Sequence, residues 1–240
     1  MDDEIILVDK PAGISSFGVV SRVRGAMMKV LKGEEIEGEV FGAREEVERI
    51  GKEMREGYLK RGETIPRRLK VGHAGTLDPF ATGLLILLIG KGTKRSGEFL
   101  KLDKEYEAEV RLGATSSTGD PEGEISPVSE RIPTREEVER AVKEFVGEIQ
   151  QKVPAFSAVK INGERAYKLA RKGKEVQTPV RKVKVYQIEV LEYEYPRLSI
   201  RAEVSSGTYV RTLGEDIGKK LGVGAYLTNL RRTKVGKFSV

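Results

Sequence analysis

The chain of 240 residues is expected to adopt an α+β fold, a mixed α/β arrangement in which strands and helices intermix. Three observations predict it. Some segments alternate apolar and polar residues as half-buried strands do, and others repeat apolar residues every three to four positions as helices do. No internal repeat or regular strand-helix-strand rhythm joins them. We expect one domain, residues 1–240, because this length is ample for a core.

The N-terminal part begins with a short buried strand at residues 5–8. A Lys-Pro-Ala-Gly turn follows, and Ser15 or Ser16 can cap a helix that starts near Phe17. In residues 44–61, four apolar side chains recur every three or four positions among many charged residues. This pattern predicts a solvated amphipathic helix. Its flanks look like loops, so we expect a charged helical insertion at about 32–68. The four apolar side chains are Val47, Ile50, Met54 and Tyr58.

The remaining elements follow the same two periodicities. Thr134 opens a capping box, which predicts a helix that continues to about Val146. A second helix is expected to end at Gly222. The expected strands are residues 84–89, 106–112, 182–191 and 198–205, of which the last two should be neighbours, and the second helix should span 212–221.

Composition restricts the chemistry. There is no cysteine and one histidine, which excludes disulfides, thiol nucleophiles and metal sites built on cysteine or on two histidines. No stretch approaches the roughly 20 apolar residues of a membrane span. The first residues, Met-Asp-Asp-Glu, are unlike a signal peptide, so we expect a cytoplasmic protein without membrane contact.

Basic residues exceed acidic ones by 43 to 37, and the excess is clustered. Clustered cations favour a polyanionic partner such as nucleic acid. The alternative is the solvated surface of a heat-adapted protein, which is also rich in lysine and glutamate. The clusters are Arg171, Lys172, Lys174, Arg181, Lys182 and Lys184, and then Arg211, Lys219, Lys220, Arg231, Arg232, Lys234 and Lys237.

Asp78 is the first candidate for chemistry. It lies between a glycine-rich turn and an apolar run, where a carboxylate has to be exposed by a sharp turn or paired. His73, the single histidine, lies five residues earlier. The alternative is a turn role, since aspartate before proline commonly starts a turn.

Three further stretches are candidates. Tyr209 and Arg211 follow a glycine at a strand-to-helix junction, and an arginine beside an active carboxylate would lower its pKa by about 1–3 units. A surface arginine is the alternative. Tyr106 is either core filler or a platform on which a base stacks. Near the C-terminus, Arg231 and Arg232 are interpreted as ion-paired surface residues.

These stretches together resemble the TruB-type bacterial tRNA pseudouridine synthases. The resemblance covers almost the whole chain, and its aspartate motif is highly specific. The matching segments are Lys-Pro-x-Gly-x-Ser-Ser at 10–16, Gly-His-x-Gly-Thr-Leu-Asp-Pro-x-Ala-Thr-Gly at 72–83, Lys-x-Tyr at 104–106, Val-Pro-Ala-Phe-Ser-Ala-Val-Lys at 153–160, Gly-Thr-Tyr-x-Arg-Thr at 207–212 and Leu-x-Arg-Arg near the end.

The resemblance implies a central, mostly antiparallel mixed sheet flanked by helices. It implies an enzyme that isomerises uridine 55 in the tRNA T loop to pseudouridine without cofactor or metal, and without an obligate protein partner. Asp78 matches the catalytic aspartate and Arg211 the arginine that pairs with it. The matching substrate-binding positions are His73, which helps hold the flipped nucleotide, Tyr106, which packs on the target ring, and Tyr209 and Leu230.

The chemical route stays open at this stage. An ionised carboxylate can attack the sugar C1′, attack the uracil ring or act as a base on the sugar. In each case the base has to be extruded from the folded loop into a pocket. Two rivals also stay open, a non-catalytic tRNA-binding or tRNA-folding module and pseudouridylation of another RNA. A glycosidase or nuclease is disfavoured, because neither a second catalytic carboxylate nor a metal cluster is evident.

Two departures from the family pattern are expected to matter. We expect the chain to lack the further C-terminal RNA-binding domain that many members carry. The insertion at 32–68 is longer than the link expected there. It either supplements RNA contact or is a solvated insertion without function, and its nearly balanced charge favours the second interpretation slightly.

Overall fold

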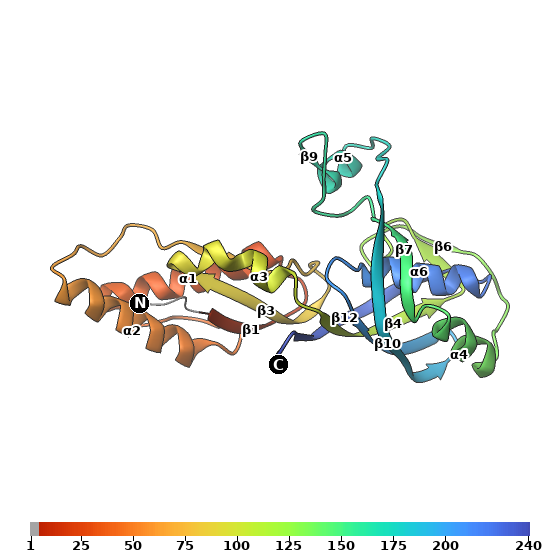
Figure 1. The fold of residues 1–240 in the computed structure, drawn as a ribbon, viewed down its shortest axis with the longest axis horizontal. Helices are drawn as coiled ribbons and strands as arrows, with labels where there is room; N and C mark the ends of the chain where they lie inside the picture. Colours follow the sequence, from red (N-terminus) through yellow and green to blue (C-terminus); the bar gives the residue numbers. More distant parts are fainter. Residues whose placement is uncertain (1–4) are drawn as a thin grey trace. The chain divides into compact units, whose positions relative to one another are not determined.

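The computed structural model describes residues 5–240 and divides into two compact units. Unit 1 holds the chain up to Leu102 together with Arg231–Val240, and unit 2 holds Asp103–Leu230 (Figure 1). The Met-Asp-Asp-Glu start, from which we argued against a signal peptide, lies outside the described residues. Within residues 5–240, every helix is too short or too polar to span a bilayer.

Unit 1 is built on a small mixed sheet with helices beside it. In this sheet β1 and β2 both pair antiparallel to β3, and the end of β12 pairs parallel to β3 through Arg231 and Arg232. Strand β13 pairs with β12. The elements of unit 1 are β1 (Ile5–Lys10), α1 (Ser16–Lys32), α2 (Arg44–Lys60), β2 (Val71–His73), β3 (Thr82–Ile89), the 3₁₀ helix η1 (Gly90–Arg95), α3 (Ser96–Leu100) and β13 (Phe238–Ser239), with the end of β12 (Ala225–Val235).

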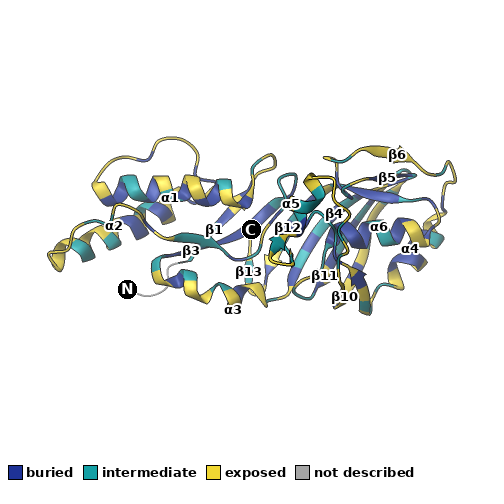
Figure 2. Cartoon of the chain, turned by 90° about the horizontal axis from the view of Figure 1, so that it is seen from above, coloured by how far each residue is buried: buried dark blue, intermediate teal, exposed yellow. Residues whose placement is uncertain are grey.

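The predicted insertion helix is α2, and it belongs to the core of unit 1. Val47 and Ile50 are fully buried in the apolar cluster that also holds the inner faces of α1, β1 and β3. The outer face of α2 is exposed (Figure 2). The predicted helix cap is also confirmed, because the Ser15 hydroxyl accepts a hydrogen bond from the Gly18 amide at 3.1 Å.

Unit 2 is built on a sheet with the strand order β12–β4–β11–β10–β7, in which β11 pairs antiparallel with β4 and β10, and β10 pairs antiparallel with β7. Two very short strands and a helix form a separate projection between β7 and β10 in the ribbon (Figure 1). The elements of unit 2 are β4 (Lys104–Leu112), β5 (Ala114–Ser116), β6 (Ile125–Pro127), α4 (Arg135–Lys143), β7 (Gly147–Lys152), β8 (Lys160–Ile161), β9 (Glu164–Arg165), α5 (Ala166–Arg171), β10 (Val180–Glu194), β11 (Arg197–Val204) and α6 (Val210–Lys220), with the start of β12.

The α+β class and the predicted elements are confirmed, with one difference in length. The capping box at Thr134 is present, but α4 ends at Lys143 rather than near Val146. The amides of Phe145 and Val146 donate to carbonyls three residues back, which tightens the last turn, and Gly147 then takes a φ of +109°. Such a left-handed residue ends a helix and favours glycine.

Candidate active site

Asp78 lies in the loop between β2 and β3 of unit 1. The Ala74 amide donates to the Ile86 carbonyl at 2.9 Å, and the Ala81 amide donates to the Asp78 carbonyl at 3.1 Å. The second bond closes a tight turn around Asp78, whose residue surface is half-buried. The sharp turn expected here is present, and it places the half-buried Asp78 next to the apolar strand β3.

The last residue of β1 and the first residue of α1 hold this loop in place. The Ser16 hydroxyl accepts from the Leu77 amide at 2.8 Å and donates to the Leu77 carbonyl at 2.9 Å. The Lys10 ammonium, which is fully buried, donates to the carbonyls of Pro79 at 3.1 Å and Ala81 at 2.6 Å, and also to that of Pro11 at 2.8 Å. These bonds fix the backbone on both sides of Asp78.

Arg232 fastens the same loop from β12. Only 1% of its surface is exposed, and its guanidinium donates to the Leu84 carbonyl at 2.8 Å and the Gly75 carbonyl at 3.1 Å. The interpretation of Arg232 as an ion-paired surface residue is therefore wrong. It is correct for Arg231, whose guanidinium makes two hydrogen bonds to the Asp9 carboxylate.

In unit 2, Arg211 lies in the first turn of α6 and is 4% exposed. Its Nη1 donates to Asp120 Oδ2 at 3.2 Å and to the Thr118 carbonyl at 2.8 Å, and its Nη2 donates to the Phe156 carbonyl at 2.7 Å. The surface interpretation of Arg211 is therefore wrong. A planar guanidinium bound to three acceptors has one fixed orientation.

Asp120 is the residue that the sequence reasoning missed. Its side chain is 6% exposed, and Oδ1 accepts from the Thr118 hydroxyl at 2.5 Å and from the Glu122 amide at 3.0 Å. The only signal was the Gly-Asp-Pro-Glu-Gly sequence, which predicts a turn and is equally typical of a surface loop. The turn exists, but it carries a buried acid that pairs with Arg211.

Glu215, one helical turn after Arg211, adds a third ionisable group to this region and is half-buried. Burial raises the pKa of its carboxyl to about 7, while Arg211 acts in the opposite direction. The nearby Asp216 and Asp120 raise this pKa further. Burial also raises the pKa of Asp216.

The other predicted residues of unit 2 lie on two strands and at the start of a helix. Tyr106 is 9% exposed on β4 and faces Ala202 of β11 in the register, and Leu230 is 5% exposed on β12. The backbone of Tyr209 is held by Gln151, whose side chain accepts from the Tyr209 amide at 2.7 Å and donates to its carbonyl at 3.0 Å. Tyr209 thus stands at the start of α6, two residues before Arg211.

The structure groups the predicted residues by unit. In unit 1, His73 is the last residue of β2, and Asp78 lies in the loop that follows this strand. The residues in unit 2 are Tyr106, Tyr209, Arg211 and Leu230. The pairing of Arg211 with Asp78 stays a prediction. Among the described residues, no group of three or more histidine or acidic side chains is arranged to hold a metal ion.

Two family models match this chain. Residues 63–210 match the N-terminal domain of TruB family pseudouridylate synthases, and residues 211–240 match the C-terminal domain of tRNA pseudouridylate synthase B.

Curated relatives and solved structures agree with these matches. tRNA pseudouridine synthase B of Bacteroides fragilis is 44% identical over 98% of this chain and 87% of its own length. The protein of the same name from Borreliella burgdorferi is 50% identical over 70% of this chain and 61% of its own. A chain in the crystal structure of a Cbf5-Nop10-Gar1 complex is 31% identical, with a TM-score of 0.63 over 98% of this chain. Since that alignment covers 49% of the other chain, the present chain spans about half its length. The chain belongs to the TruB family of pseudouridylate synthases.

Proposed function

We propose that this protein converts uridine 55 in the T loop of tRNA to pseudouridine, with Asp78 as the catalytic carboxylate and no cofactor. The observation that carries the proposal is the loop around Asp78. The buried residues Lys10, Ser16 and Arg232 hold this loop through hydrogen bonds to its backbone. A loop fixed in this way suits catalysis, because displacement by about 1 Å can cost on the order of 100-fold in rate.

The reaction is an isomerisation. The bond between C1′ and N1 of the uracil breaks, the base turns within its pocket, and a bond forms between C1′ and C5. The proton on C5 is lost and N1 gains one, so nothing else is consumed. The carboxylate of Asp78 assists by attack on C1′, by attack on the uracil ring or by removing a sugar proton, and all three require its ionised form.

We propose that Arg211 keeps Asp78 ionised and that the other predicted residues form the nucleotide pocket. A fixed, buried guanidinium lowers the pKa of a carboxyl beside it. Tyr106 would pack on the target ring, Tyr209 and Leu230 would complete the wall, and His73 would help hold the flipped nucleotide. Base flipping is needed because the reacting atoms of a stacked base are out of reach.

The partner we propose is the T stem-loop of tRNA, and the site of action is the cytoplasm. The projection from β8 to the loop after α5 supports RNA contact, because it carries a dense set of exposed cations. Phosphates are the acceptors such cations suit, since double-stranded RNA is recognised largely by shape and backbone. The exposed cations are Lys160, Arg165, Lys168, Arg171, Lys172 and Lys174.

The test is to incubate the protein with a T-arm stem-loop, digest the RNA to nucleosides and measure pseudouridine by mass spectrometry. Wild type should form pseudouridine without added cofactor. Asp78→Asn should bind the stem-loop with unchanged affinity and form none. Pseudouridine formed by that variant would exclude Asp78 as the catalytic group. Binding without product by the wild type would favour the rival, a non-catalytic binding module.

A further inference from the structure

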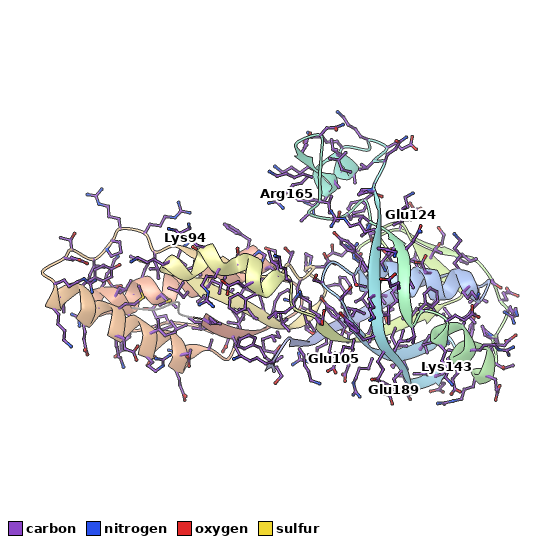
Figure 3. The ribbon with its side chains drawn as sticks, in the orientation of Figure 1. Lys94, Glu105, Glu124, Lys143, Arg165 and Glu189 are labelled. Carbon is purple, nitrogen blue, oxygen red and sulfur yellow. The ribbon has the colours of Figure 1, made fainter. Side chains whose placement is uncertain are left out.

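Unit 1 carries five exposed cations on two adjoining segments. Arg67, Arg68 and Lys70 precede β2, and Lys91 and Lys94 lie in η1. Among residues 5–240, none of the five has an acidic partner within ion-pair distance. We call these five residues the β2–η1 cations. Lys94 is labelled on this part of unit 1 in Figure 3.

The backbone brings the two segments together. The Gly90 amide donates to the Lys70 carbonyl at 2.8 Å, and Val71 of β2 lies opposite Ile89 of β3. Leu69 is 4% exposed and packs in the core of unit 1, which anchors the first segment. Its neighbours Arg68 and Lys70 are therefore held at the surface close to the start of η1.

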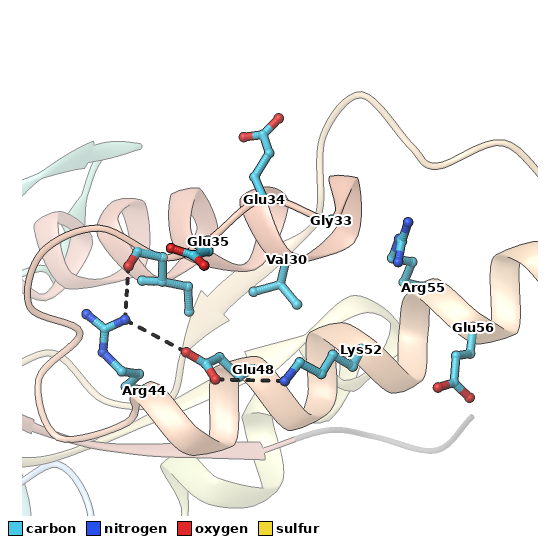
Figure 4. Close-up of a pocket in the computed structure, with 10 residues that line it drawn as sticks. Val30, Gly33, Glu34, Glu35, Arg44, Glu48, Lys52, Arg55 and Glu56 are labelled. Atoms are coloured by element: carbon cyan, nitrogen blue, oxygen red, sulfur yellow. Dashed lines mark hydrogen bonds and ion pairs between the residues drawn. The ribbon is translucent and has the colours of Figure 1, made fainter.

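The neighbouring helix α2 shows the opposite arrangement. Four of its cations lie within 4 Å of a glutamate on the same helix. Where α2 faces the end of α1, the pocket in Figure 4 is lined by both signs, with Arg44, Glu48 and Lys52 in one chain of contacts. The paired cations are Arg44, Arg49, Lys52 and Lys60. Charge on α2 is neutralised internally, and an RNA phosphate gains little there.

We propose that the β2–η1 cations bind the phosphate backbone of the RNA substrate. This inference rests on the proposed function, which makes the ligand an RNA. Unpaired cations held close together repel one another, and phosphates relieve this repulsion while their own counterions are released. The insertion at 32–68 had two interpretations, RNA contact or a solvated segment without function. The first then applies to its C-terminal end, which holds Arg67 and Arg68, while α2 itself is a packed helix with a solvated outer face.

The position of the cluster suits a contact near the target nucleotide. Strand β2 runs from Lys70 into the Asp78 loop and has three residues, a length of about 10 Å at 3.3 Å per residue. The contact would be independent of base sequence, because only phosphates are recognised.

The test compares two triple variants, each of which removes three positive charges from unit 1. Arg67→Ala/Arg68→Ala/Lys91→Ala removes three β2–η1 cations, and Arg49→Ala/Lys52→Ala/Lys60→Ala removes three paired cations of α2. Binding of unmodified tRNA is measured by filter retention across a series of salt concentrations. The first variant should bind roughly tenfold or more weakly, and the slope of log affinity against log salt should fall by about 1 for each phosphate that is no longer bound. The control variant should follow the wild type.

Two outcomes would overturn the proposal. One is equal weakening in both variants, which would reflect net charge alone. The other is wild-type affinity and salt slope in the first variant. Pseudouridine formation at saturating RNA should be unchanged in both variants. Failure of the proposed function would appear as a wild type that forms no product, so it is distinguishable from failure of this inference.

Discussion

The guanidinium of Arg211 lies 3.2 Å from the carboxylate of Asp120, and the two side chains are only 4% and 6% exposed. The carboxylate is itself held by Thr118 and by the Glu122 amide. Burying two charges costs free energy, so the ion pair adds little net stability. Removing one partner is nevertheless destabilising, because it leaves the other charge buried without a counterion. We therefore interpret the role of Asp120 as fixing the orientation of the Arg211 guanidinium in unit 2.

The first prediction concerns this pair. Asp120→Asn should lower kcat for pseudouridine formation by on the order of 100-fold, because Arg211 loses the charge that orients it. The stranded guanidinium should also lower the free energy of unfolding by roughly 3–5 kcal/mol. Steady-state assays at saturating RNA and urea denaturation measure the two effects. Affinity for tRNA should hardly change, and an intact kcat would exclude a positioning role for Asp120.

The second prediction concerns the Lys10 clamp. Lys10→Met should destabilise the protein by roughly 1–3 kcal/mol, because the buried Ala81 carbonyl loses the ammonium group that donates to it. It should also slow product formation, since Pro79 and Ala81, which follow Asp78, lose their hydrogen bonds to Lys10. Thermal unfolding and the pseudouridine assay check this. The matched control is Lys101→Met, an exposed lysine, which should stay within about 0.5 kcal/mol of wild type.

The third prediction concerns Gly83, at the crossing of β3 and β12. Its φ is +97°, and an added Cβ would lie 2.3 Å from the Arg232 carbonyl oxygen. Gly83→Ala should therefore lower the free energy of unfolding by several times the roughly 1–2 kcal/mol that left-handed backbone alone costs an alanine. Gly13→Ala is the control, because its φ is +81° with no atom within 4 Å of the new methyl. Equal losses in the two variants would contradict the steric argument.

The fourth prediction concerns pH. The pKa of Glu215 rises to about 7 in the folded protein, mainly through burial, from 4.5 as a free side chain. Between pH 4.5 and about 7, the folded state therefore binds more protons at Glu215 than the unfolded state does. The contribution of Glu215 to the free energy of unfolding falls as the pH rises through this range. Glu215→Gln should be more stable than wild type at pH 8 and should flatten this part of the pH profile. Chemical denaturation at a series of pH values measures it, with exposed Glu130→Gln as control; a profile that keeps the wild-type slope would contradict the assignment.

The strands, helices and caps were predictable because their signals are local. The capping box at Thr134 and the apolar spacing of Val47, Ile50, Met54 and Tyr58 each lie within a few turns of chain. The loop at Asp78 was identified as a candidate site for the same reason, since its glycines and proline adjoin the apolar strand. That the whole chain forms a single catalytic domain stays a prediction, as do the roles of the six site residues.

The sequence by itself determined the secondary structure, the family and the candidate acid, since these depend on residues near one another or on motifs in a fixed order. Only the tertiary structure decided which charges are buried. Lys10 and Arg232 meet the Asp78 loop, and Asp120 meets Arg211, through hydrogen bonds that join positions 69 to 157 residues apart in the chain. A charged residue looks alike in a sequence whether water or a buried partner solvates it, and folding alone sets that surrounding.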